Sequence, residues 1–209
     1  MIFGNIEDRM KDVLYENTLQ SYKTEVKSEV QSAISSIEYY YNLSDSGKID
    51  EATAKKDALE ALRNLRYGDD DSGYFWVDDT DYNLVMHPIL PEQEGTNRYD
   101  LTDKNGVKII QSIMKTAESG GGFNEFYFTK SDGKTVAPKV AYSQKFDKWN
   151  WVITTGIYSD DIHEIVNKSD GLRRIVKIFN GSANFLIVVG IVLVLVMLVI
   201  SYVIIKRLF

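Results

Sequence analysis

The chain has 209 residues, a net charge of −6 and no cysteine, so it has room for one medium-sized domain with an appendage and no means of forming a disulfide or a thiolate metal site. Acidic residues outnumber basic ones and no cluster of Lys and Arg stands out, which argues against nucleic acid as a partner. The two histidines are too few for a histidine-rich metal site.

The first third of the chain is predicted to be helical. Across residues 5–43, apolar side chains recur at spacings of three and four, and no Pro or Gly interrupts them. A helix this long must lie along something. Packing against the rest of the domain is one interpretation, and a homodimer contact along the apolar stripe is the other. A second helix is expected over residues 50–66.

The middle of the chain is predicted to be an antiparallel sheet. Short runs rich in aromatic and β-branched residues are separated by Gly, Asp and Asn, which is typical of strands and turns. We expect a helix over residues 107–118 and an α+β fold with about five strands, at residues 73–78, 83–87, 123–130, 135–146 and 149–158. Alternation places Tyr74, Trp76 and Asp78 on one face, and Phe75 and Val77 on the other. Both faces are largely apolar, so both should be covered.

The C-terminal segment differs in kind from the rest. Residues 185–205 carry no charge, and at about 1.5 Å per residue a helix over them spans roughly 31 Å, which matches a hydrocarbon core of roughly 30 Å. We predict a transmembrane helix here. Lys206 and Arg207 follow it, but basic residues also precede it, so charge alone leaves the orientation open. The N-terminus has no signal-peptide pattern.

No catalytic constellation stands out in the sequence. There is no nucleophile elbow and no phosphate loop, so we expect neither an enzyme nor a cofactor. Asp78, Asp79 and Asp81 lack the spacing of an EF-hand loop, and we attribute them to turn chemistry rather than to a metal site.

A different set of residues falls at strand and helix ends around the predicted sheet. Cationic and hydroxyl donors over aromatic walls suit a small anion, above all a carboxylate. The candidate ligand-binding residues are Arg66, Tyr67, Tyr74, Trp76, His87, Lys139 and Tyr142. Lys139 and Tyr142 would point to opposite faces of a regular strand, so Pro138 would have to bend it for both to serve. Plainer interpretations are a surface lysine, a strand-end histidine and an arginine that complements a helix C-terminus.

Seven motifs occur in order along the chain: Leu65-Arg66-Tyr67-Gly68, Gly73-Tyr74-Phe75-Trp76, Met86-His87-Pro88, Asp103-Lys104-Asn105-Gly106, Gly122-Phe123, Pro138-Lys139, and Trp149-Asn150-Trp151-Val152 leading to Gly156-Ile157-Tyr158-Ser159-Asp160-Asp161-Ile162. With them, residues from about 5 to 165 resemble the single Cache domain of bacterial and archaeal chemoreceptors. The resemblance implies a PAS-like antiparallel sheet behind a long N-terminal helix, and a pocket for small organic ligands, often short carboxylates. By motif position, Arg66, Tyr67, His87 and Lys139 fall where such domains bind ligand.

The resemblance also implies a place in the cell membrane. The sensor domain would be extracytoplasmic and would signal through the transmembrane helix to a HAMP linker and a methyl-accepting domain. The expected organisation is a long helix over 1–49, the Cache domain over 50–165, a juxtamembrane helix over 166–184, the transmembrane helix over 185–205 and the start of a cytoplasmic segment over 206–209.

Departures from the family pattern keep alternatives open. The family usually begins with a first transmembrane helix, and this chain shows neither that helix nor HAMP and output domains, so we expect a fragment of a longer receptor. The output domain could equally be a histidine kinase or a cyclic-dinucleotide enzyme. A membrane-anchored interaction module that binds no small ligand is a further alternative. A membrane-anchored hydrolase would need a nucleophile and base that the sequence does not offer.

Overall fold

The computed structural model describes the backbone of residues 2–68 and 71–208; the side chains of residues 2–7, of 199–208 and of several positions between 170 and 183 lie outside the description. The chain divides into two units. One comprises residues 16–163 and holds the sheet, and the other comprises the terminal segments 1–15 and 164–209.

Two helices precede the sheet. Helix α1 runs over Ile2–Asp45 and helix α2 over Glu51–Asn64. Helix α2 begins at an N-cap, Asp50, whose carboxylate accepts a hydrogen bond from the backbone N–H of Thr53. It ends two residues earlier than expected because Leu65 has an extended backbone, which leaves Arg66 beyond the helix.

The sheet has the five antiparallel strands that the sequence predicts. They are β1 (Trp76–Asp79), β2 (Leu84–Met86), β3 (Gly122–Thr129), β4 (Val136–Phe146) and β5 (Trp151–Tyr158), in the spatial order β2-β1-β5-β4-β3. Strand β1 starts three residues later than expected, because Gly73 pairs with Tyr67 in an isolated bridge. The long central pairing of β4 with β5 sets Lys139 directly opposite Tyr158.

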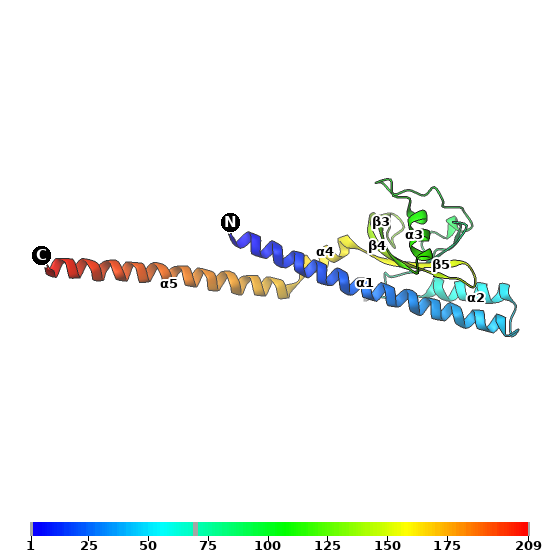
Figure 1. Cartoon of the computed structure of the whole chain (residues 1–209), viewed down its shortest axis with the longest axis horizontal. Helices are drawn as coiled ribbons and strands as arrows, with labels where there is room; N and C mark the ends of the chain where they lie inside the picture. The colour runs from blue at the N-terminus through cyan, green and yellow to red at the C-terminus, as the bar shows by residue number, and fades with distance from the viewer. Residues whose placement is uncertain (1, 69–70, 209) are drawn as a thin grey trace. The chain divides into compact units, whose positions relative to one another are not determined.

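Both faces of the sheet are covered, which confirms the expectation from the alternating pattern. Helices α1 and α2 cover one face, where Val26, Val30 and Ile37 of α1 pack with Phe75 and Ile153 (Figure 1). The apolar stripe of α1 is therefore buried within the domain over this stretch. Helix α3 (Ile109–Glu118) and the loop that contains the short helix η1 (Pro91–Gln93) lie on the other face (Figure 1).

Strand β4 is regular around Pro138, where the sequence left open whether the proline bends the strand. Its pairing with β3 runs from Gly122–Ser143 to Thr129–Val136 without a register shift, and Pro138 lies inside this regular stretch. Tyr142 accordingly joins the core beneath α1 and α2. Lys139 lies on the opposite face, so Pro138 does not bring these two side chains together.

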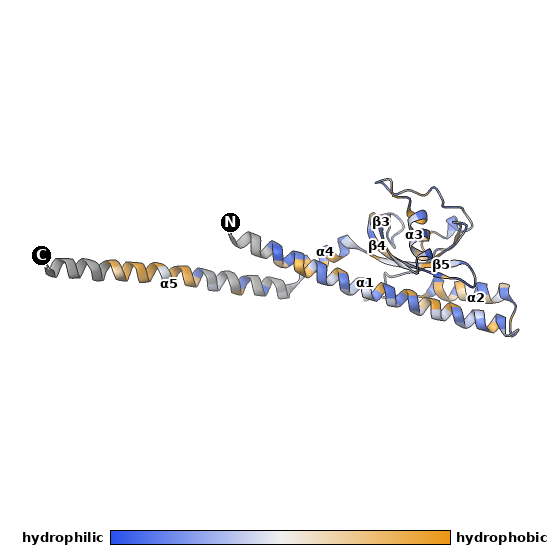
Figure 2. Cartoon of the chain, viewed as in Figure 1, coloured by the Kyte–Doolittle hydropathy of each residue, from blue (hydrophilic) through white to orange (hydrophobic). Residues whose placement is uncertain are grey.

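The chain ends in helices α4 (Ser159–Lys168) and α5 (Asp170–Leu208), which are separated at Ser169 rather than near Gly171. Within the part of the chain that the structure describes, none of the helices has the length and apolar character needed to span a bilayer. The predicted segment 185–205 continues into residues whose side chains lie outside the description, and it stays a prediction. Its described part is hydrophobic apart from one paler turn (Figure 2).

Candidate ligand-binding site

A lysine amine is buried at the centre of the face that carries α3. Lys139 on β4 is 1% exposed, and its Nζ donates hydrogen bonds to the hydroxyl oxygens of Tyr74 at 3.0 Å and Tyr158 at 3.3 Å. Aromatic rings surround it, with centroids 4.2 Å away for Tyr74, 4.6 Å for Tyr158 and 4.9 Å for Trp76. Burial holds the pKa of the Lys139 amine well below its usual value, because water no longer solvates the charged form.

The two tyrosine hydroxyls are oriented by a single backbone carbonyl. Tyr74 and Tyr158 both donate to the carbonyl oxygen of Thr129, at the end of β3, and their oxygens lie 3.2 Å apart. Each oxygen is thereby left to accept from Lys139. Burial raises the pKa of Tyr74 to about 12 and also raises that of Tyr158, so both hydroxyls stay protonated at neutral pH.

His87 presents one ring nitrogen to its own loop and leaves the other without a partner. Its Nδ1 accepts hydrogen bonds from the backbone N–H groups of Ile89 at 3.1 Å and Leu90 at 3.2 Å, so the proton of the neutral ring is on Nε2. Burial, helped by the positive charge of Arg98, lowers the pKa of His87 to about 2. The ring stacks on Trp76, with centroids 5.9 Å apart.

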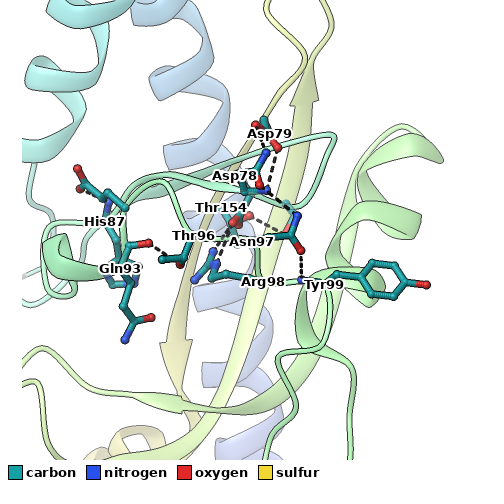
Figure 3. Close-up of polar contacts among 12 residues, drawn as sticks. Asp78, Asp79, His87, Gln93, Thr96, Asn97, Arg98, Tyr99 and Thr154 are labelled. Carbon is teal, nitrogen blue, oxygen red and sulfur yellow. Dashed lines mark hydrogen bonds and ion pairs between the residues drawn. The ribbon is translucent and has the colours of Figure 1, made fainter.

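A buried ion pair lies beside this group. Arg98 donates to Asp78 Oδ1 through Nε at 3.0 Å and through Nη2, and both side chains are almost fully buried (Figure 3). Burial raises the pKa of the Asp78 carboxyl group, and the guanidinium opposes this. The loop that carries Arg98 is anchored to the sheet, because the backbone N–H of Arg98 donates to the carbonyl of Tyr82 at 2.7 Å.

Three buried donors in this region lack an acceptor among the described residues: Trp76 Nε1, His87 Nε2 and Arg98 Nη1. The indole N–H of Trp76 is near enough to Asp78 to lower the carboxyl pKa, but it makes no hydrogen bond of good geometry. A buried donor left unpaired costs about 1–3 kcal/mol, so a bound acceptor would recover free energy here. We call the group formed by Tyr74, Trp76, His87, Arg98, Lys139 and Tyr158 the amine cluster.

Four of the seven residues predicted from the sequence lie in the amine cluster, and three lie elsewhere. Tyr74, Trp76, His87 and Lys139 come together. Arg66 is half-buried at the end of α2, where it donates to the carbonyl oxygens of Arg63 and Leu65 at 2.8 and 2.9 Å.

Tyr67 and Tyr142 both lie on the side of the sheet covered by α1 and α2, away from Lys139. The hydroxyl of Tyr67 pairs with that of Thr155, and its ring packs on Phe75. The hydroxyl of Tyr142 donates to the side chain of Gln144 at 3.4 Å.

Two cluster members were missed from the sequence. Tyr158 could have been found, because the pairing of two strands across a short turn places it opposite Lys139. Arg98 could not, since it lies in a polar loop and its role depends on a partner twenty residues earlier in the chain. The turn interpretation holds for Asp79, which accepts from the backbone N–H groups of Asp81 and Asn83, but it was wrong for Asp78, which is a buried strand residue.

Comparison with known proteins places the chain among sensor domains. Residues 18–170 match the family described as Single Cache domain 2. The chain is 33% identical over 175 residues to the sensor histidine kinase MctS of Rhizobium johnstonii, covering 83% of this chain and 37% of that protein. It is 28% identical over 144 residues to the methyl-accepting chemotaxis protein McpP of Pseudomonas putida, covering 68% of this chain and 26% of that protein. The chain thus spans little more than a third of one relative and about a quarter of the other.

Solved structures with the same fold include chemosensory domains. A periplasmic sensor domain of a chemotaxis protein superposes with a TM-score of 0.64 at 32% identity, covering 67% of this chain and 96% of that one. A Cache chemosensory domain described for carboxylic acid recognition also gives a TM-score of 0.64, at 26% identity, covering 68% of this chain and 97% of that one.

Proposed function

The chain belongs to the Single Cache domain 2 family, and from this premise we propose that residues 16–163 bind a small organic carboxylate in the amine cluster and act as the sensor domain of a membrane receptor. The observation that carries the proposal is the complete burial of the Lys139 amine. A fully buried amine faces aromatic rings and hydroxyl groups, with unpaired donors on His87, Trp76 and Arg98 nearby. A carboxylate supplies both the negative charge and the acceptors that these groups lack.

The composition of the cluster favours a short ligand with one carboxylate group. Arg98 is already paired with Asp78, so the amine of Lys139, in its protonated form, is left to meet a ligand charge. The rings of Trp76 and Phe128, stacked 5.6 Å apart at 9°, offer an apolar wall to a short hydrocarbon tail. One solved relative is described for carboxylic acid recognition, which supports this ligand class.

We propose that the signal leaves the domain through the helices after β5 and crosses the membrane at residues 185–205. Tyr158, which contacts Lys139, is followed directly by Ser159, the first residue of α4. The apolar side chains of Phe185, Ile191 and Leu198 are more than half exposed, as expected of a surface that meets lipid. A ligand that favours one arrangement of β5 and α4 would shift the population of the receptor between signalling states.

The relatives indicate two kinds of output domain that this sensor domain could control. Both a sensor histidine kinase and methyl-accepting chemotaxis proteins match the chain, so we propose a chemoreceptor or a kinase receptor in the cell membrane with an extracytoplasmic sensor domain. A homodimer through α1 and a cyclic-dinucleotide output domain stay predictions.

Calorimetric titration with acetate, propionate, succinate and glycine tests the proposed site. We expect saturable binding of at least one short carboxylate and a loss of about 10- to 100-fold in affinity in Lys139→Met, because a charge-assisted hydrogen bond is worth about 1.5–3 kcal/mol. Lys145→Met is the matched control, since Lys145 is on the same strand and pairs with Asp147. Equal affinity in Lys139→Met and Lys145→Met would contradict the site. Arg66→Ala tests the residue predicted from sequence that lies outside the cluster.

A further inference from the structure

Among the residues that the structure describes, none of the carboxylates pairs with the amine of Lys139. The described acidic side chains around the cluster pair with other cations: Asp78 with Arg98, Glu94 with Arg63 at 2.7 Å, and Asp160 and Asp161 with Lys130 at 2.8 and 2.6 Å. The aromatic side chains that face it are neutral: Tyr74 before β1, Trp76 on β1, Phe128 on β3 and Tyr158 on β5.

The charged groups that face the cluster from its other elements occur as ion pairs, Arg98 with Asp78 and Lys130 with Asp160 and Asp161. Arg98, from the loop after η1, and Lys130, at the end of β3, are both cations, and Lys130 lies 5.2 Å from the ring centroid of Tyr158. His87, from the loop after β2, is neutral because its Nδ1 accepts two backbone hydrogen bonds. An isolated charge in such surroundings costs several kcal/mol, and buried lysines respond by losing their proton.

The hydrogen bonds of the cluster match an uncharged amine. A neutral amine has two N–H groups, and Lys139 donates to two acceptors, Tyr74 and Tyr158. Neither tyrosine can donate in return, because both hydroxyl protons are directed to the carbonyl of Thr129. Protonation of the amine creates a third N–H, and that donor is the one available to a bound carboxylate.

We propose that Lys139 is an uncharged amine in the ligand-free domain and takes up one proton from solvent when a carboxylate binds. The proton joins the lone pair of Nζ, and no covalent bond of the ligand changes. The inference rests on the proposed function, since it concerns the same site. It means that the domain responds to the product of carboxylate and proton concentrations, and therefore to the undissociated acid.

The affinity of the domain for a carboxylate should therefore depend on pH in a defined way. Burial lowers the pKa of Lys139 in the ligand-free domain. At a pH above that pKa the amine is mostly unprotonated, so part of the binding free energy is used to protonate it and the affinity falls. We expect the apparent Kd to rise tenfold for each pH unit above that value and to be constant below it, as long as the ligand stays ionised.

Two measurements on the full chain in detergent micelles test the proposal. The first is an NMR titration of ¹³Cε-labelled lysine in the ligand-free protein, with the Lys139 signal assigned by its loss in Lys139→Met. We expect one lysine signal to titrate well below the others. Titration of Lys139 together with the exposed lysines would overturn the proposal whether or not any ligand binds.

The second measurement is calorimetric titration with acetate at pH 8 in phosphate and in Tris, whose ionisation enthalpies differ. We expect close to one proton taken up per acetate bound. Acetate binding without buffer dependence would overturn the coupling while leaving the proposed carboxylate site intact. If neither acetate nor propionate binds, the proposed function fails together with the coupling, and a depressed Lys139 titration in the first measurement would then stand as a property of the free domain alone.

Discussion

His87 is held neutral by the direction of its hydrogen bonds as well as by its burial. Two backbone N–H groups point at Nδ1, so a proton could not be added there without breaking both bonds. The ring packs against the aromatic side chains of Tyr74 and Trp76. Its Nε2–H has no acceptor among the described residues. This arrangement makes the histidine a fixed donor rather than a pH-sensitive group in the folded state.

Acid should therefore destabilise the domain through His87. The pKa is about 2 in the folded protein against an ordinary value of 6.5, so between these values the unfolded chain binds a proton that the folded protein does not. Stability is present in full above pH 6.5 and falls as the pH is lowered, by about 2 kcal/mol at pH 5. Urea unfolding at pH 7.5 and pH 5 measures this loss.

The variant that isolates this effect is His87→Asn, whose Oδ1 can accept from Ile89 and Leu90 in place of Nδ1. It should lose less stability between pH 7.5 and pH 5 than the parent, by about the same 2 kcal/mol. His163→Asn controls for the removal of a histidine outside the cluster, as His163 is exposed on α4. Equal acid sensitivity in His87→Asn and the parent would show that His87 does not carry the effect.

Gly156 sets the spacing between the two central strands. A Cβ at this position would overlap the carbonyl oxygen of Val140 and would lie 2.7 Å from Cα of Ala141, and both are backbone atoms of β4. Gly156→Ala should therefore destabilise the domain by about 1–3 kcal/mol, the usual range for overpacking. Urea unfolding measures the change, and a variant as stable as the parent would mean that the strands can separate at no cost.

At the scale of the elements, α1 contributes to the domain through one buried stripe. Ile37 is fully buried against the sheet, whereas Tyr39, two residues along the same helix, is 60% exposed. Ile37→Ala should cost about 2–5 kcal/mol and Tyr39→Ala less than about 1 kcal/mol, as measured by urea unfolding. Similar losses in the two variants would indicate that the outer face of α1 is also packed, as in the homodimer predicted from the sequence.

Lys130 ties the end of β3 to the first turn of α4. Its ion pairs with Asp160 and Asp161 are partly exposed, so Lys130→Met should change global stability by less than about 1 kcal/mol. Hydrogen exchange in the first turn of α4 should nevertheless become faster, because that turn loses its link to the sheet. Lys168→Met, which removes the pair with Glu164 inside α4, is the control. Unchanged exchange in the first turn would show that Lys130 does not hold the helix.

The helices and strands were predicted from the sequence more accurately than the contacts between side chains that are distant in the chain. Alternation over the predicted strand 73–78 placed Trp76 and Phe75 on the correct faces, because a chain segment with two covered faces still obeys the two-residue period. Helix ends were less accurate, since α2 stops where Leu65 becomes extended. The site was found in part: Tyr74, Trp76, His87 and Lys139 were predicted, but the pairing of Arg98 with Asp78 depends on how a polar loop folds back over the sheet.

At the scale of the whole molecule, the domain uses its two sheet faces differently. The face under α1 and α2 is an apolar core that holds the sheet on the long helix. Among the described residues, the face under α3 carries unpaired polar atoms on Trp76, Asp78, His87 and Arg98, whereas the core beneath α1 and α2 also has one, the indole nitrogen of Trp149. Incomplete hydrogen bonding of buried groups is a cost that a protein retains where a ligand completes it, and this is the physical reason for proposing that the ligand binds on the face under α3.

The indole N–H signals of the three tryptophans offer the most direct test of carboxylate binding in the amine cluster. The indole nitrogens of Trp76 and Trp149 both lack a hydrogen bond among the described residues, but Trp76 lies in the cluster, whereas Trp149 and Trp151 pack beneath α1 and α2. During titration with a short carboxylate, the Trp76 signal, assigned by its loss in Trp76→Phe, should shift saturably in ¹⁵N-resolved NMR spectra. The signals of Trp149 and Trp151 should stay in place. Saturable binding that moves either of those two signals and leaves Trp76 unchanged would contradict the assignment of the site.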